Sequence, residues 1–159
     1  MNRGGKLRGE DGVALTEFAL VLPVVLVLVF GVISFGKALT YWLDLTRIAN
    51  EGARWAAVNQ YPGCPLTDAP GACTPTLQSY LASRITSDEL RTGGSQEVPD
   101  GATVRICTPP DSSVGDPVTV TVETTYNWLP FVNAGGITLA GSSTMRLEHS
   151  PTHIAFDSC

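Results

Sequence analysis

One stretch of apolar residues, from Val13 to Gly36, constrains this chain more than any other feature of its sequence. It contains 24 residues, which as a helix would measure about 36 Å, and the hydrocarbon core of a bilayer is about 30 Å thick. Lipid offers the backbone no hydrogen-bond partners, so such a segment crosses a membrane as a helix. A secretory signal has a shorter apolar region that ends at small residues, and no such site ends this run. We therefore predict a transmembrane helix over residues 13–36, with a bend between Ala19 and Pro23 because proline removes a helical hydrogen bond.

A single carboxylate, Glu17, lies near the start of the apolar run. The 19 residues from Phe18 to Gly36 carry no charge. An acid inside a membrane helix costs a few kcal/mol, and acids in such positions tend to have a function. Glu17 is therefore a candidate functional residue.

The charges on either side of the run predict its orientation. Arg3, Lys6 and Arg8 precede it, whereas only Lys37 follows it closely. Because basic residues stay on the cytoplasmic side, we predict that the N-terminus lies in the cytoplasm and the rest of the chain outside. Residues 1–12, which are rich in charge and glycine, then form a cytoplasmic leader that we expect to be disordered.

The helix is predicted to continue outside the membrane over residues 37–59 as an amphipathic segment. One face is polar and carries four residues that can form successive ion pairs: Asp44, Arg47, Glu51 and Arg54. The opposite face is mainly apolar and includes Ala38 and Trp42. The whole helix, from Val13 to about Val58, would be about 70 Å long.

Small residues make part of this segment slim. They are Ala49, Gly52, Ala53 and Ala56. Small residues at this spacing let another backbone approach closely. Two occupants of this surface stay open, which are the chain's own β-sheet and the helix of a neighbouring subunit.

Residues 60–159 are predicted to form a domain outside the membrane. Residues 60–75 are dense in proline and glycine, which indicates a loop that ends the long helix. Residues 76–91 place Leu77, Leu81 and Ile85 at four-residue spacing, which predicts a short helix. Later segments alternate apolar and polar residues as strands do; they are residues 104–107, 118–123 and 137–148.

The fold class that follows is α+β. The long N-terminal helix packs on a small, mostly antiparallel sheet of three to four strands, with one short extra helix. Turn-rich segments between the strands favour an antiparallel meander. One apolar face of that sheet needs a cover, which the long helix supplies.

Four cysteines follow the apolar run, on the side that we predict to be oxidising, where disulfides persist. Three pairings are possible. We favour Cys64 with Cys73, which closes a turn-rich loop, and Cys107 with Cys159, which would hold the C-terminal tail.

The remaining chemistry predicts neither an enzyme nor a nucleic-acid-binding protein. The net charge is −5, and no cluster of Lys or Arg lies beyond the N-terminus. His149 and His153 are four residues apart, but Pro151 between them disfavours a helix, and no further ligand completes a zinc site. A nucleophilic Cys159 is disfavoured because exported cysteines are ordinarily bridged. We therefore expect no catalytic residue, no metal and no cofactor.

The N-terminal third resembles the class III signal of type IV pilins and pseudopilins, and more closely the TadE family of tight-adherence (Flp) pilus systems. The resemblance rests on Gly12, on the residues from Val13 to Phe18 with Glu17 among them, on the apolar run with Pro23, and on the segment 50–54. It covers about fifty residues. It implies a pilin-like α+β fold in the cytoplasmic (inner) membrane.

The resemblance also implies a set of partners and a processing step. A prepilin peptidase would cut after Gly12, so that Val13 becomes the new N-terminus. Glu17 would then pair with the N-terminus of an adjoining subunit and draw the helices into register. The partners implied are other pilins or pseudopilins, membrane lipid and the inner-membrane assembly platform of the pilus. A domain of about 100 residues suggests a minor pilin rather than the short major Flp pilin.

A second hypothesis belongs to another class of protein. The chain could be an unprocessed single-pass membrane protein whose outer domain binds a ligand or an envelope component. Glu17 and Gly12 discriminate between the two, because only the pilin-like hypothesis needs them.

Overall fold

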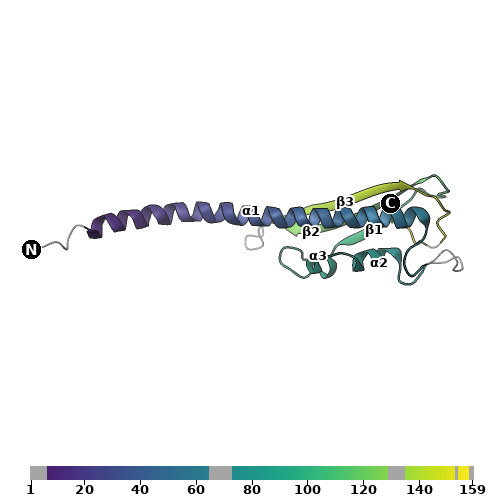
Figure 1. Cartoon of the computed structure of the whole chain (residues 1–159), viewed down its shortest axis with the longest axis horizontal. Helices are drawn as coiled ribbons and strands as arrows, with labels where there is room; N and C mark the ends of the chain where they lie inside the picture. The colour runs from purple at the N-terminus through teal and green to yellow at the C-terminus, as the bar shows by residue number, and fades with distance from the viewer. Residues whose placement is uncertain (1–6, 65–72, 129–134, 153, 158–159) are drawn as a thin grey trace, which may run out of the picture. The chain divides into compact units, whose positions relative to one another are not determined.

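The computed structural model describes residues 7–64, 73–128, 135–152 and 154–157. The described chain is α+β, as predicted (Figure 1). Its elements in chain order are the helices α1 (Leu7–Val58), α2 (Leu77–Ser83) and α3 (Asp88–Thr92) and the strands β1 (Thr103–Cys107), β2 (Pro117–Asn127) and β3 (Gly136–Arg146). The strands form one antiparallel sheet in the order β1-β2-β3. The chain divides into two compact units, Met1–Lys37 and Ala38–Cys159.

The first unit contains the apolar part of α1. From Gly12 to Lys37 every side chain except that of Ser34 is exposed. This is the one helix in the described chain that is long and apolar enough to cross a membrane. A helix that is apolar on all sides, and that no other part of the protein covers, is suited to a lipid environment. The chain is thus compatible with a single-pass membrane protein.

The start of α1 differs from the prediction. The helix begins at Leu7 rather than at Val13, so residues 7–12 of the expected disordered leader are helical. Once a helix is nucleated, each further residue adds one backbone hydrogen bond, and propagation can continue into a polar segment. The helix also continues through Pro23 without interruption, and the bend expected there stays a prediction.

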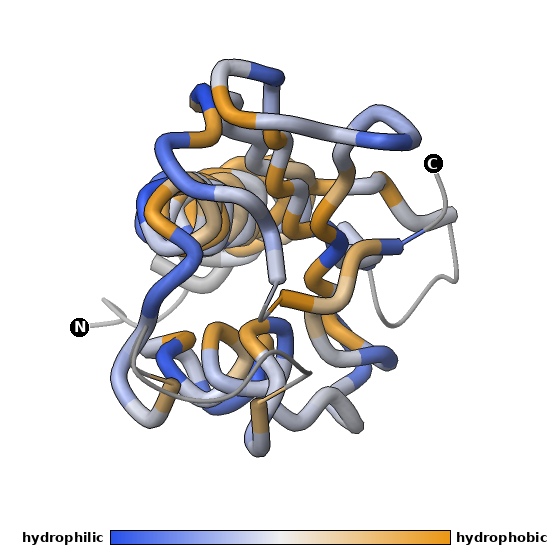
Figure 2. The backbone as a smooth tube through the Cα atoms, turned by 90° about the vertical axis from the view of Figure 1, so that its right-hand side faces the viewer, coloured by the Kyte–Doolittle hydropathy of each residue, from blue (hydrophilic) through white to orange (hydrophobic). Residues whose placement is uncertain are grey.

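In the second unit α1 covers one face of the sheet. Leu45, Ile48 and Ala49 on α1 are fully buried, as are Val120 and Val122 on β2. Seen along the long axis, the hydrophobic segments of the helices and the strands turn toward a common interior (Figure 2). The apolar face of the sheet is therefore closed by helix, as the sequence predicted.

The side of α1 that enters the core is partly different from the predicted one. Tyr41 and Ile48 are buried, with 6% and 0% exposure, whereas Trp42 is 44% exposed. The ring of Tyr41 packs edge-on against Tyr126 of β2, with centroids 5.8 Å apart. Trp42, the next residue, lies about 100° further around the helix than Tyr41 and therefore outside the core.

The sheet alternates as expected for a layer covered on one face. Along β2 the even-numbered residues from Val118 to Tyr126 are buried and the odd-numbered ones are more exposed. On β3, Gly141 is the buried residue, and a Cβ there would lie 2.5 Å from the backbone nitrogen of Thr46. A glycine at this position is what allows the backbone of α1 to reach the strand.

The helix predicted over residues 76–91 is two short helices instead. Ile85 is buried as expected, at 2% exposure, but it lies between α2 and α3. The chain turns there because the carboxylate of Asp44 accepts hydrogen bonds from the N–H groups of Thr86 (3.0 Å) and Ser87 (3.3 Å). Those N–H groups are consequently unavailable to a continuous helix.

Candidate functional site

The segment from Gly12 to Glu17 lies on the exposed, apolar part of α1. A Cβ built on Gly12 would meet no atom within 4 Å, so the backbone here is open. Val13 and Phe18 are 58% and 65% exposed. The hydroxyl of Thr16 donates to the carbonyl of Val13 at 2.8 Å. The peptide bond between Gly12 and Val13 therefore lies in a helical segment that no other described element covers.

Glu17 lies on the same side of the helix as Val13, one turn further along, because residues four apart share a face. It is exposed and makes no hydrogen bond or ion pair with any residue that the structure describes. A carboxylate among lipid-facing side chains is costly unless an opposite charge lies nearby. Within the described residues of one chain, α1 presents this acid without the cation that would offset it.

The small residues of α1 contact the chain's own core. Ala49, Ala53 and Ala56 are 0% exposed. A Cβ on Gly52 would lie 2.6 Å from Cδ1 of Leu81 and 3.0 Å from Cγ1 of Val120. The surface of α1 at these residues is filled by α2 and the sheet.

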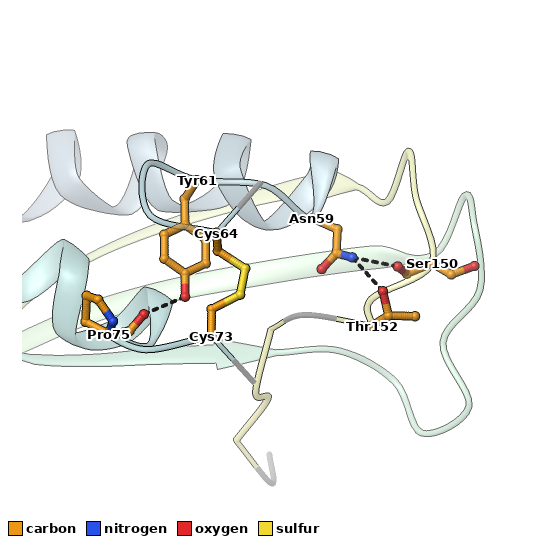
Figure 3. Close-up of a disulfide and its surroundings, with 7 residues drawn as sticks. All are labelled: Asn59, Tyr61, Cys64, Cys73, Pro75, Ser150 and Thr152. Atoms are coloured by element: carbon orange, nitrogen blue, oxygen red, sulfur yellow. Dashed lines mark hydrogen bonds between the residues drawn. A yellow bond between two sulfur atoms is a disulfide. The ribbon is translucent and has the colours of Figure 1, made fainter. Parts of the chain in front are cut away.

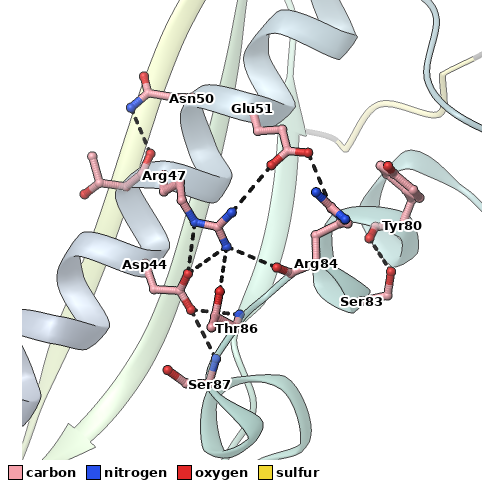
Figure 4. A network of polar contacts seen from close by, with 10 residues as sticks. Asp44, Arg47, Asn50, Glu51, Tyr80, Ser83, Arg84, Thr86 and Ser87 are labelled. Carbon is pink, nitrogen blue, oxygen red and sulfur yellow. Dashed lines mark hydrogen bonds and ion pairs between the residues drawn. The ribbon is translucent and has the colours of Figure 1, made fainter.

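A polar network joins α1 to the connection between α2 and α3 (Figure 4). Besides its two backbone partners, Asp44 forms an ion pair with Arg47 at 2.9 Å. Arg47 also donates to the carbonyl of Arg84 (3.1 Å) and the hydroxyl of Thr86 (2.9 Å). Glu51 lies 3.9 Å from Arg47 and 3.6 Å from Arg84.

Only some of the ion pairs predicted along α1 therefore join two residues of that helix. Asp44 and Glu51 each reach a partner outside the helix, and Arg54 has no such pair among the described residues. The helical spacing indicated the pairs within α1 but carried no signal for the distant partners Arg84, Thr86 and Ser87.

The end of α1 is held by the C-terminal tail (Figure 3). Asn59 has a left-handed backbone with φ of 52°, a conformation that commonly ends helices. Its side-chain nitrogen donates to the carbonyl of Ser150 (2.9 Å) and the hydroxyl of Thr152 (3.1 Å). An asparagine just after a helix is the sequence signal that indicates such a cap.

The predicted disulfide between Cys64 and Cys73 is present, with Cα atoms 5.7 Å apart. Beside it the hydroxyl of Tyr61 donates to the carbonyl of Pro75 at 2.7 Å (Figure 3). Burial raises the pKa of the Tyr61 hydroxyl above its usual value. Cys107 is disulfide-bonded as well, and its predicted partner Cys159 lies outside the described residues.

The structure describes only one of the two histidines that we considered as metal ligands. His149 is exposed, and His153 lies outside the described residues. Among the residues that the structure describes, no three His, Cys, Asp or Glu side chains come together as metal ligands would.

Comparison with protein families gives one result for the helix that carries these residues. The family model described as "TadE-like protein" matches residues 12–54. Residues 12–54 of this chain are TadE-like. The match begins at Gly12, includes Glu17 and ends at Arg54, as the resemblance of the sequence indicated. Neither the curated proteins nor the solved structures compared with the chain match it.

The TadE-like segment comprises most of α1, including the apolar part and the small residues that pack on the sheet. It indicates a protein associated with a tight-adherence pilus. The sheet, α2 and α3 lie outside the matched residues, so the family match gives no information about what the outer domain contacts.

Proposed function

We propose that this chain is a TadE-like minor pilin or pseudopilin that takes part in the assembly of a tight-adherence (Flp) pilus. In this role a prepilin peptidase cuts after Gly12, and the mature helix begins at Val13. The partners are other pilins or pseudopilins and the assembly platform in the inner membrane. The role is structural and requires no catalysis.

One observation carries the proposal: Glu17 is an exposed carboxylate on an apolar helix, without a partner among the described residues. A new α-amino group at Val13 would lie one helical turn away in the same chain, and the amine of an adjoining subunit could serve equally. An ammonium and a carboxylate at the edge of lipid cost much less together than apart. Pairing between subunits would therefore favour helices in register.

The test combines two substitutions with N-terminal sequencing of the membrane-extracted protein. We expect Val13 as the first residue of the native protein and an uncut chain for Gly12→Ala. Glu17→Gln keeps the shape and removes the charge, so it should insert normally but reduce pilus assembly by about tenfold, which corresponds to about 1.4 kcal/mol. Thr16→Val is the matched control, since it changes the neighbouring polar residue and should assemble normally.

The competing function is an unprocessed single-pass protein with a binding domain outside the membrane. It predicts an intact Met1 and no effect of Gly12→Ala or Glu17→Gln on assembly. That result would contradict the proposal of a pilin-like protein and favour an anchored binding protein.

A further inference from the structure

The two edges of the sheet are protected to different degrees. β1 is five residues long, and the C-terminal tail covers its outer edge. The N–H of Asp157 donates to the carbonyl of Ile106 (2.8 Å), and the N–H of Ile106 donates to the carboxylate of Asp157 (2.9 Å). These bonds satisfy the backbone groups that Ile106 turns away from β2.

β3 forms the other edge of the sheet, and it is long and almost without charge. It has 11 residues and contains no proline, lysine, aspartate or glutamate. Its one charged residue, Arg146, is the last. Edge strands ordinarily carry prolines, charges or bulges, or are covered, because their free backbone groups pair with other chains. Figure 1 shows β3 as the outermost strand.

The register identifies the backbone groups that β3 turns outward. The N–H of Leu147 donates to the carbonyl of Asp116 at 2.8 Å, so Leu147 faces β2. Alternation then directs the odd-numbered residues of β3 to β2 and the even-numbered ones away from it. The outward residues are Thr138, Ala140, Ser142 and Thr144, whose side chains are small and exposed. Their outward backbone groups make no hydrogen bond with any described residue.

A hollow of about 800 Å³ adjoins this end of the strand. Asn50, Arg54 and Ala57 of α1 line it together with Met145 of β3 and with Glu148. The guanidinium of Arg54 forms no ion pair with a residue in the described part of the chain. A strand laid along β3 would therefore find backbone donors and acceptors, apolar side chains and a cation.

We propose that β3 is the docking edge for an extended segment of a partner protein, which adds to the sheet as a fourth strand. The segment turns alternate small apolar side chains toward the hollow and places a carboxylate within reach of Arg54. Main-chain hydrogen bonds supply most of its affinity, as in other cases of strand addition.

A second copy of this chain is a poorer occupant. The β3 strand of a second copy contains no aspartate or glutamate. It would therefore bring no carboxylate to Arg54.

The test uses the full chain in detergent micelles and a fluorescent peptide that copies Pro117–Asn127. This peptide has the sequence that already pairs with β3, alternates valine with threonine and carries one carboxylate, Glu123. We expect saturable binding that Ser142→Pro weakens by about tenfold. That substitution removes one outward N–H and none of the N–H groups that bond to β2. Ser142→Thr, the matched control, should bind as the native chain does.

A second measurement needs no substitution. Amide hydrogen exchange at Ala140, Ser142 and Thr144 should be fast in the free chain and slowed by the peptide. Binding that is equal in the native and Ser142→Pro chains, exchange at these amides that the peptide does not slow, or no saturable binding up to about 1 mM would overturn the proposal. The binding test uses the unprocessed chain, so its result does not depend on whether the bond after Gly12 is cut. Failure of processing at Gly12 is detected by N-terminal sequencing instead.

Discussion

At the scale of single residues, Asn59 determines how the long helix ends. Its N–H donates to the carbonyl of Ala56 and the N–H of Gln60 to that of Trp55, both at 3.2 Å. This pair of bonds is the Schellman arrangement, which needs a left-handed residue between helix and loop. The side chain, only 1% exposed, is bonded to the tail at the same time. Asn59 thus combines a backbone role with a side-chain role.

Two substitutions separate these roles. Asn59→Gly keeps the left-handed backbone and loses the side-chain bonds, so it should lower the free energy of unfolding by about 1–2 kcal/mol. Asn59→Ala also forces a residue with a Cβ into the left-handed region, which costs roughly a further 1–2 kcal/mol. Urea unfolding of the full chain in micelles measures both. Equal losses for the two variants would show that the left-handed conformation contributes nothing.

Asp116 supports the connection between β1 and β2 by its charge. The backbone N–H of Ser113 donates to its carboxylate at 2.7 Å, and the Ser113 hydroxyl donates at 3.0 Å. These bonds, with the nearby Arg146 cation, hold the pKa of the Asp116 carboxyl below its usual value.

A group whose pKa is lower in the folded state stabilises the fold above its unfolded pKa, and this stability is lost as the pH falls through the folded value. The native chain should therefore lose stability relative to Asp116→Asn as the pH falls below about 4. Unfolding curves measured at several pH values check this difference. Asp111→Asn controls for the loss of one negative charge from the same connection. Parallel curves for the native chain and Asp116→Asn would contradict the assignment.

At the scale of elements, two glycines determine how closely α1 approaches its neighbours. Gly141 lets the backbone of α1 reach β3, since a Cβ would lie 2.7 Å from the carbonyl carbon of Leu45. Gly52 lets α2 and β2 reach α1, but the atoms that its Cβ would meet belong to the side chains of Leu81 and Val120. Side chains can shift where packed backbone cannot.

We therefore expect unequal effects from the same substitution. Gly141→Ala should destabilise by about 3 kcal/mol, at the upper end for overpacking. Gly52→Ala should cost less, because Leu81 can change rotamer and alanine favours a helix by up to about 1 kcal/mol. Thermal unfolding of both variants tests the order. A larger loss for Gly52→Ala would mean that the backbone contact at Gly141 is not the tighter one.

At the scale of the whole molecule, the apolar helix and its flanking charges support the proposed orientation in a membrane. Three basic residues, Arg3, Lys6 and Arg8, precede it, and the disulfide-bonded cysteines Cys64 and Cys73 follow it. A disulfide persists where the surroundings are oxidising. The proposed orientation therefore puts residues 38–159 outside the cytoplasm.

Protease added to sealed, right-side-out membrane vesicles tests this orientation. It should remove residues 38–159 and leave a protected fragment that contains residues 13–36. Inside-out vesicles are the control, in which the outer domain should survive. Protection of the domain in right-side-out vesicles would reverse the assigned topology.

Much of the fold and of the candidate site follows from local pattern. Gly12 and Glu17 are five residues apart on one helix, so a single stretch of sequence is enough to recognise them. The period of two in β2 and the proline-rich loop after Val58 are likewise short-range signals. The disulfide between Cys64 and Cys73 closes a short loop and was predictable for the same reason.

The sequence by itself determined the apolar helix, its single acid and the order of helix and strands, because each depends on residues that are neighbours along the chain. Only the tertiary structure decided where the segment 76–91 breaks, since the carboxylate that holds the turn comes from Asp44, 42 residues before Thr86. It also decided that Tyr41 rather than Trp42 enters the core, through the ring of Tyr126. The open edge of β3 likewise depends on the tertiary structure, because a strand is an edge only once the strands have paired in the order β1-β2-β3.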